Sequence, residues 1–135
     1  MNVYSIGADI LQHWHWVEPR LKRAIKRSLR GDLTTGHYLV SILNGEAFIG
    51  VVEDAGEVQT IVLFVPSKDT LHMEAWEGKN MGQWVEPALA VVDGWAKGLG
   101  CKYITSKSRP GAAKILQKVA GYQVHDYYMK KEVSA

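Results

Sequence analysis

The sequence predicts a single α/β domain whose mixed sheet combines antiparallel hairpin strands with parallel strands. Three observations predict it. Helical and strand-like hydrophobic periodicities follow one another along the chain, the connections between them are short, and neither a repeat nor a linker interrupts them. A chain of 135 residues is long enough to bury a core without metals or disulfides. We therefore expect one domain over residues 1–135.

Two helices are expected in the first third of the chain. Apolar residues recur at helical spacing over Ile10–Leu29, and Pro19 either kinks this helix or begins a second one. A shorter helix fits Thr35–Leu43, with Thr34 or Asp32 as its N-cap. The first helix also carries six Lys and Arg residues between positions 20 and 30.

The hydrophobic period then changes to that of strands. Residues 47–52 and the β-branched run 58–65 flank the turn 53–56, so they predict a hairpin. Leu71–Trp76 alternates apolar and polar residues and predicts a third strand, followed by a loop over Gly78–Gly82.

The rest of the chain predicts two further helix–strand pairs. A helix is expected over Gln83–Lys97 and a short strand over Cys101–Ser106. A helix over residues 110–119 and a final strand over residues 122–133 complete the order. Hairpin strands followed by this β-α-β-α-β tail indicate a mixed sheet.

Composition narrows the function classes. The single cysteine, Cys101, cannot form an internal disulfide, no apolar run is long enough to span a membrane, and the N-terminus lacks a signal-peptide pattern, so we expect a cytoplasmic protein. The net charge of +2 and the absence of a known motif argue against nucleic acid. We interpret the basic helix face as solvated, with an acidic protein partner as the alternative. His13 and His15 lack ligands at metal spacing, so no metal site is expected.

The second half of the chain resembles the GNAT superfamily of N-acetyltransferases. The resemblance covers Leu71–Val133. It depends on a tryptophan-alanine-lysine before a glycine within residues 94–100, on the strand at residues 101–104, and on a helix over residues 112–122 that ends in glycine and tyrosine. It implies the GNAT-like acyl-CoA N-acyltransferase fold. It also implies that a splayed strand and the following loop bind acetyl-CoA, the loop and helix N-terminus holding the pyrophosphate. Mapped onto this chain, the cofactor-binding residues would be Met73, Ala75, Trp76, Lys79, Asn80, Gly82 and Gln83.

Two positions depart from the family pattern. Gly78 and Gly82 are out of register with the glycines that let the backbone approach phosphate closely, although Lys79 could supply charge instead. Gln117 stands where the family often has a tyrosine that protonates the leaving thiolate, and an amide cannot act as an acid.

His72 and Glu74 are the candidate catalytic residues. An amine must lose a proton before it attacks a thioester, and these two side chains share one face of the predicted strand. The alternative interpretation is a polar strand face exposed to solvent.

The sequence leaves two function classes open. One is an acyl-CoA-dependent N-acetyltransferase acting on an amine acceptor. The other is a non-catalytic protein that acts through protein partners or self-association, because the N-terminal pattern at residues 16–19 and 44–46 resembles the small GNAT-like proteins of tailed phages, some of them virion proteins. In that case the location would be the host cytoplasm or the virion.

Overall fold

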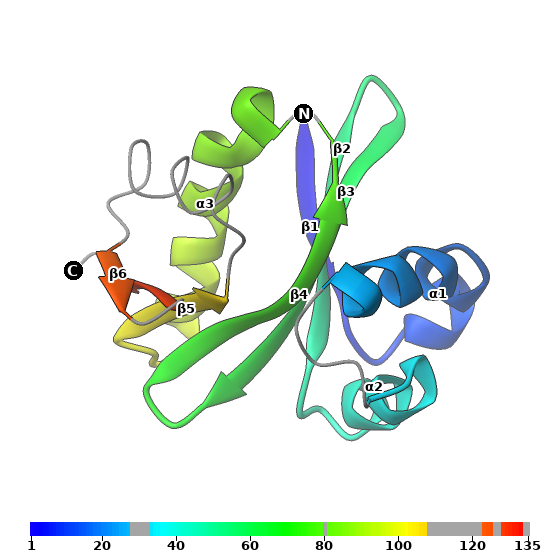
Figure 1. Ribbon diagram of the computed structural model, residues 1–135, viewed down its shortest axis with the longest axis horizontal. Coiled ribbons are helices and arrows are strands. Elements are labelled where there is room, and N and C mark those ends of the chain that lie inside the picture. The colour runs from blue at the N-terminus through cyan, green and yellow to red at the C-terminus, as the bar shows by residue number, and fades with distance from the viewer. Residues whose placement is uncertain (28–32, 80, 108–122, 126–127, 134–135) are drawn as a thin grey trace. The chain divides into compact units, whose positions relative to one another are not determined.

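A computed structural model of the protein describes residues 1–27, 33–79, 81–107, 123–125 and 128–133 (Figure 1). In this part of the chain seven strands are ordered β1-β2-β3-β4-β5-β7-β6. Pairing between β4 and β5 is parallel and that between β5 and β7 antiparallel, so the sheet is mixed, as the sequence predicts. The elements are β1 (Asn2–Ile6), α1 (Ile10–Arg27), α2 (Thr35–Leu43), β2 (Phe48–Asp54), β3 (Glu57–Ser67), β4 (Thr70–Gly78), α3 (Met81–Gly98), β5 (Tyr103–Lys107), β6 (Gln123–His125) and β7 (Tyr128–Glu132).

Contacts within the chain group into two compact units. The first unit comprises Met1–Val65 and Glu74–Lys79, and the second comprises Pro66–Met73 and Asn80–Ala135. Strand β4 therefore contributes its first half to the second unit and its second half to the first unit.

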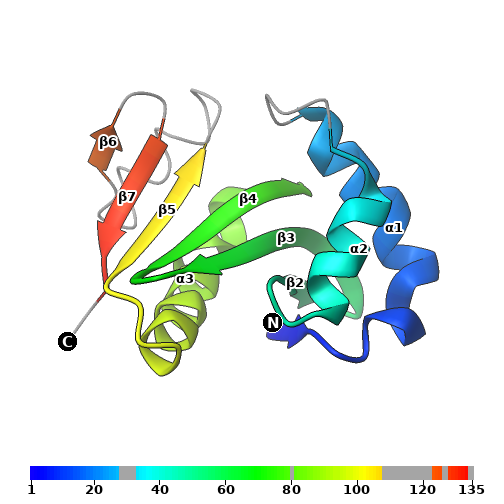
Figure 2. The ribbon, with the colours of Figure 1, turned by 90° about the horizontal axis from the view of Figure 1, so that it is seen from below.

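The first unit combines helices α1 and α2 with an antiparallel sheet. Strand β2 pairs with β1 on one side and with β3 on the other. The β2–β3 hairpin closes through Ala55 and Gly56, whose φ angles of 53° and 77° are both positive, as a two-residue hairpin turn requires. Helices α1 and α2 lie side by side (Figures 1 and 2).

One hydrophobic cluster holds this unit together. Every second residue of the paired strands points to the same face, and the apolar stripes of α1 and α2 pack on it. Its buried members are Ile6, Ile10, Val17, Leu21, Ala24, Ile25, Tyr38, Ile42, Ala47, Ile49, Val51, Ile61, Leu63 and Ala75.

The second unit places α3 against parallel and antiparallel strands. Strand β4 pairs with β5 from Thr70↔Tyr103 to Met73↔Ser106, and β5 pairs in turn with β7. Figure 2 shows β4, β5 and β7 side by side, with β6 beyond them. Helix α3 packs against β5, and Lys131 of β7 pairs with Asp93 of α3 at 3.1 Å.

Three expectations from the sequence need correction. Strand β1 was not predicted, because five residues before a helix form a strand here only by pairing with β2 across more than 40 residues of chain. Helix α3 begins at Met81 rather than Gln83, so the predicted loop is shorter and Gly78 ends β4. Within residues 122–133, where the sequence predicts one final strand, β6 and β7 are two strands that pair with each other antiparallel.

Helix α1 is continuous through Pro19. A proline inside a helix costs about 3 kcal/mol, because it removes a hydrogen bond and crowds the preceding turn. Val17 and Leu21, on either side of it, are both fully buried, so packing on the common core opposes that cost. The helix predicted over residues 110–119, with Gln117, lies outside the described residues.

Candidate functional site

Strand β4 presents a buried apolar face and a half-buried polar face. Leu71, Met73 and Ala75 are at most 2% exposed. His72, Glu74 and Trp76 alternate with them and are half-buried. The alternation of buried and half-buried residues predicted from the sequence is therefore confirmed. His72 belongs to the second unit and Glu74 to the first, so each is described within its own unit.

The position of helix α3 shows on which face of the second unit's sheet His72 lies. Lys131, which is paired with Asp93 of α3, is the register partner of Ile104 on β5, and Ile104 is in turn the partner of Leu71 on β4. Register partners point to the same side of a sheet. Helix α3 therefore covers the face of Leu71, and His72 lies on the opposite face.

His72 contacts a hydroxyl on the neighbouring strand. Its Nδ1 lies 2.7 Å from Thr105 Oγ1, and the two residues are direct register partners in the parallel β4–β5 pair. The ring is therefore oriented through one of its two nitrogens. Thr105 was not among the residues singled out in the sequence, because the pairing register decides its position.

The proposed cofactor residues of β4 offer mainly backbone groups. Met73 and Ala75 point into buried surroundings, and Ala75 belongs to the hydrophobic cluster of the first unit. Their side chains are therefore committed to packing. Only their backbone N–H and C=O groups could contact a pantetheine arm, whereas Trp76 is half-buried and keeps some exposed surface.

Gly78 is required by strand packing. A Cβ at this position would lie 2.5 Å from both Cβ and Oγ1 of Thr60 and 2.7 Å from the backbone oxygen of Gln59. The next backbone N–H, that of Lys79, donates to the same Gln59 oxygen at 3.1 Å. The glycine and the N–H that the sequence suggested for a phosphate loop are therefore used to hold the end of β4 on β3. The Lys79 side chain is exposed, and Asn80 lies outside the described residues.

The first turn of α3 is suited to an anion. It contains no acidic residue, and the first four N–H groups of a helix have no partner within the helix. Gly82 and Gln83 in this turn are exposed, and a Cβ at Gly82 would meet no heavy atom within 4 Å. A phosphate oxygen could therefore approach the backbone here.

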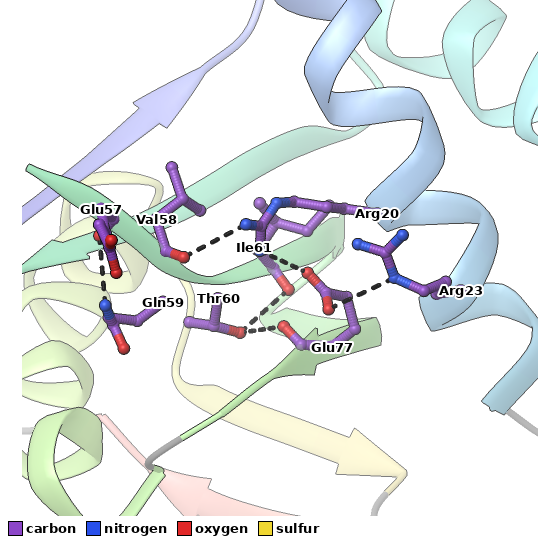
Figure 3. A network of polar contacts seen from close by, with 8 residues as sticks. All are labelled: Arg20, Arg23, Glu57, Val58, Gln59, Thr60, Ile61 and Glu77. Atoms are coloured by element: carbon purple, nitrogen blue, oxygen red, sulfur yellow. Dashed lines mark hydrogen bonds and ion pairs between the residues drawn. The ribbon is translucent and has the colours of Figure 1, made fainter.

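An ion network at the end of β4 was not expected from the sequence (Figure 3). The carboxylate of Glu77 is only 8% exposed and lies 3.0 Å from Nη1 of Arg20 and 3.9 Å from Nε of Arg23, both on α1. Arg20 also donates through Nη2 to the backbone oxygen of Val58, and the Thr60 hydroxyl donates to the backbone oxygen of Glu77. These contacts attach α1 to the end of β4.

Within the described ranges, no group of three or more His, Cys, Asp or Glu side chains could hold a metal ion. None of the helices described there is long and apolar enough to cross a membrane. Cys101 is buried, and burial together with Asp69 raises the pKa of its thiol, so it is a poor nucleophile.

Solved structures share this fold over the whole chain. Aminoglycoside 6′-acetyltransferase type Ii is similar with a TM-score of 0.72 at 12% identity, covering 100% of this chain and 99% of that one. Tetrahymena GCN5 is similar with a TM-score of 0.69 at 12% identity, covering 99% and 97%. An acetyltransferase of the GNAT family from Streptococcus pneumoniae gives 0.68 at 16% identity, covering 98% and 99%.

No protein-family model matches the sequence, and no curated protein matches it. The structural likeness at 12–16% identity shows the fold. The chain therefore has the fold of the GNAT acetyltransferases, which confirms the fold expected from residues 71–133.

Proposed function

We propose that the protein is an acyl-CoA-dependent N-acetyltransferase that transfers an acetyl group from acetyl-CoA to an amine. The observation that carries the proposal is the strand β4, whose half-buried His72 and Glu74 precede a helix with no acidic residue in its first turn. The fold shared with acetyltransferases agrees with it. The acceptor is described only by its chemistry, a primary or secondary amine.

The residues at the start of α3 would bind the pyrophosphate. Gly82 leaves room for close approach, and the helix dipole favours negative charge at this end. Lys79 adds an exposed positive charge just before the helix. Met73 and Ala75 would contact the pantetheine arm through their backbone groups.

Bound acetyl-CoA would supply an activated thioester. An amine that attacks its carbonyl carbon forms a C–N bond while the C–S bond breaks, and the amine proton must pass to a base. His72 and Glu74 are the residues of this chain proposed for that base, directly or through a water molecule. A base positioned in this way contributes about 10²–10⁴ in rate.

A matched pair of glycine variants tests cofactor binding. Gly82 and Gly94 are both exposed residues of α3, and a Cβ at either would meet nothing within 4 Å. Gly82→Ala and Gly94→Ala should each keep or raise stability, by up to about 1 kcal/mol, because alanine favours helix. In calorimetric titrations with CoA, wild type and Gly94→Ala should bind with micromolar Kd, roughly −8 kcal/mol. Gly82→Ala should bind at least tenfold more weakly. Equal CoA affinities in wild type and both variants would show that the N-terminus of α3 does not bind CoA.

A second candidate function is non-catalytic. Gly78 and the Lys79 N–H are used for strand packing, which favours a scaffold that acts through protein contacts, for example in virion structure or assembly of a phage. This candidate predicts no heat of binding and no thermal shift with CoA or acetyl-CoA at millimolar concentration. That result would refute the acetyltransferase proposal.

A further inference from the structure

The contact between His72 and Thr105 is built into the sheet. Parallel pairing of β4 with β5 makes the two residues register partners, and the side chains of register partners lie on one face. Their polar atoms, Nδ1 and Oγ1, are 2.7 Å apart, which is a short hydrogen bond. Both side chains are half-buried, so the surrounding protein restricts their alternative rotamers.

This contact decides what the other ring nitrogen can do. A neutral histidine carries one proton, and the hydrogen bond at one nitrogen determines the role of the other. If Nδ1–H donates to the threonine oxygen, Nε2 has the lone pair and can accept a proton. If the threonine hydroxyl donates to Nδ1, the proton is on Nε2 and the ring cannot act as a base there.

We propose that Thr105 is the positioning residue of His72: its hydroxyl oxygen accepts the Nδ1–H, so that Nε2 is the base that takes the proton of the attacking amine. This inference rests on the proposed acetyltransferase function and selects His72 over Glu74 as the base. When Nε2 takes the proton, the ring becomes an imidazolium and Nδ1–H continues to donate to Thr105. The electron pair of the broken C–S bond leaves with the CoA thiolate.

Two described carboxylates are near this contact along the chain. Glu74 is two positions from His72 on β4, and exposed Glu132 of β7 is the register partner of Tyr103, two positions from Thr105. Asp93 of α3 and its partner Lys131 of β7 lie on the other face. The hydroxyl of Thr105 is the group that the structure places on Nδ1 of His72.

Three variants separate the hydrogen bond from packing. Thr105→Val keeps the shape and removes the hydroxyl, whereas Thr105→Ser keeps the hydroxyl. Thr70→Val is the matched control, because Thr70 lies on the same strand pair and its hydroxyl contacts exposed Asp69. Thermal melting of all three establishes that each variant is folded.

The first readout does not depend on activity. NMR of protein labelled with ¹⁵N in the histidine rings, with His72→Gln to assign the signal, reports the tautomer of His72. We expect the Nδ1–H form in wild type, Thr105→Ser and Thr70→Val, and its loss in Thr105→Val. The Nε2–H form in wild type would overturn the proposal whether or not the protein is an enzyme.

The second readout is the pH dependence of acetyl transfer. Thr105→Val should lower kcat about 10- to 100-fold, leave KM for acetyl-CoA unchanged and shift the acidic limb of the profile, and Thr105→Ser should restore all three. An unchanged kcat and acidic limb in Thr105→Val would assign the base to Glu74 instead. If wild type does not bind CoA, the proposed function and the role of His72 as base both fail, while the NMR result still decides the hydrogen bond.

Discussion

The network of Arg20, Arg23 and Glu77 predicts a measurable coupling between helix α1 and strand β4. The closest contact joins Arg20 Nη1 and Glu77 Oε1 at 3.0 Å. With an effective dielectric constant of about 20, the attraction is about 5.5 kcal/mol. The Arg20 side chain is 28% exposed, so solvent screens part of this attraction, and the coupling should be about 2 kcal/mol.

A double-mutant cycle measures this coupling. Arg20→Met keeps most of the aliphatic stem but leaves Glu77 with Arg23 alone, at 3.9 Å and half-exposed. Urea unfolding should show a loss of about 2–3 kcal/mol for this variant and a smaller loss for Glu77→Gln. The double variant should be about 2 kcal/mol more stable than the sum of the two single losses implies. Lys22→Met, an exposed change on the same helix, should stay within about 0.5 kcal/mol of wild type.

Additive losses would refute this reasoning. Sites that do not interact add within about 0.3–0.5 kcal/mol. If the double variant loses the sum of the single values within that margin, the pair contributes no coupling and the 3.0 Å contact is not maintained in solution.

Two further predictions concern strand β1 and the end of β4. Gly78→Ala should lower the free energy of unfolding by at least about 2 kcal/mol, because the added Cβ would overlap Thr60. A Cβ at Gly7 would meet no atom within 4 Å, so Gly7→Ala should change the free energy of unfolding by less than about 1 kcal/mol. Equal losses of stability in the two variants would contradict the close approach of Gly78 to Thr60. Burial and a hydrogen bond to Glu53 raise the pKa of Tyr4 to about 12. The folded state therefore holds this proton more tightly than the unfolded state, so the stabilisation is complete below pH 10 and is lost as pH rises towards 12. Unfolding of Tyr4→Phe should depend less on alkaline pH than that of wild type, and parallel curves would show that Tyr4 is not perturbed.

The sequence was informative where local signals agree with tertiary structure. Helix α2 begins and ends where its capping residues predict, since the hydroxyl of Thr34 accepts from His37 N–H at 3.3 Å and Asn44 follows the last helical residue. The alternation of apolar and polar residues along β4 correctly predicted which of its side chains are buried. Capping and alternation depend on neighbours a few residues away, so a single sequence contains them.

The contacts that organise the candidate site depend on distant residues. Arg20 and Glu77 are 57 positions apart, and His72 and Thr105 are 33 apart. Nothing in the composition of α1 distinguished Arg20 from the other basic residues of its face. Only the pairing register of β4 with β5 brings Thr105 to His72, and a shift by one residue would place Ile104 or Ser106 there instead.

The division of β4 between the two units has a consequence for biosynthesis. The first unit needs Glu74–Lys79 to complete its core, because Ala75 belongs to its hydrophobic cluster, yet eight residues of the second unit are translated between Val65 and Glu74. At about 5–20 residues per second, the nascent chain waits roughly 1–3 s between Val65 and Lys79. During that interval the β2–β3 hairpin has an unpaired edge that can associate with other chains. Residues 66–79 are thus the segment whose translation speed should most affect the yield of folded protein.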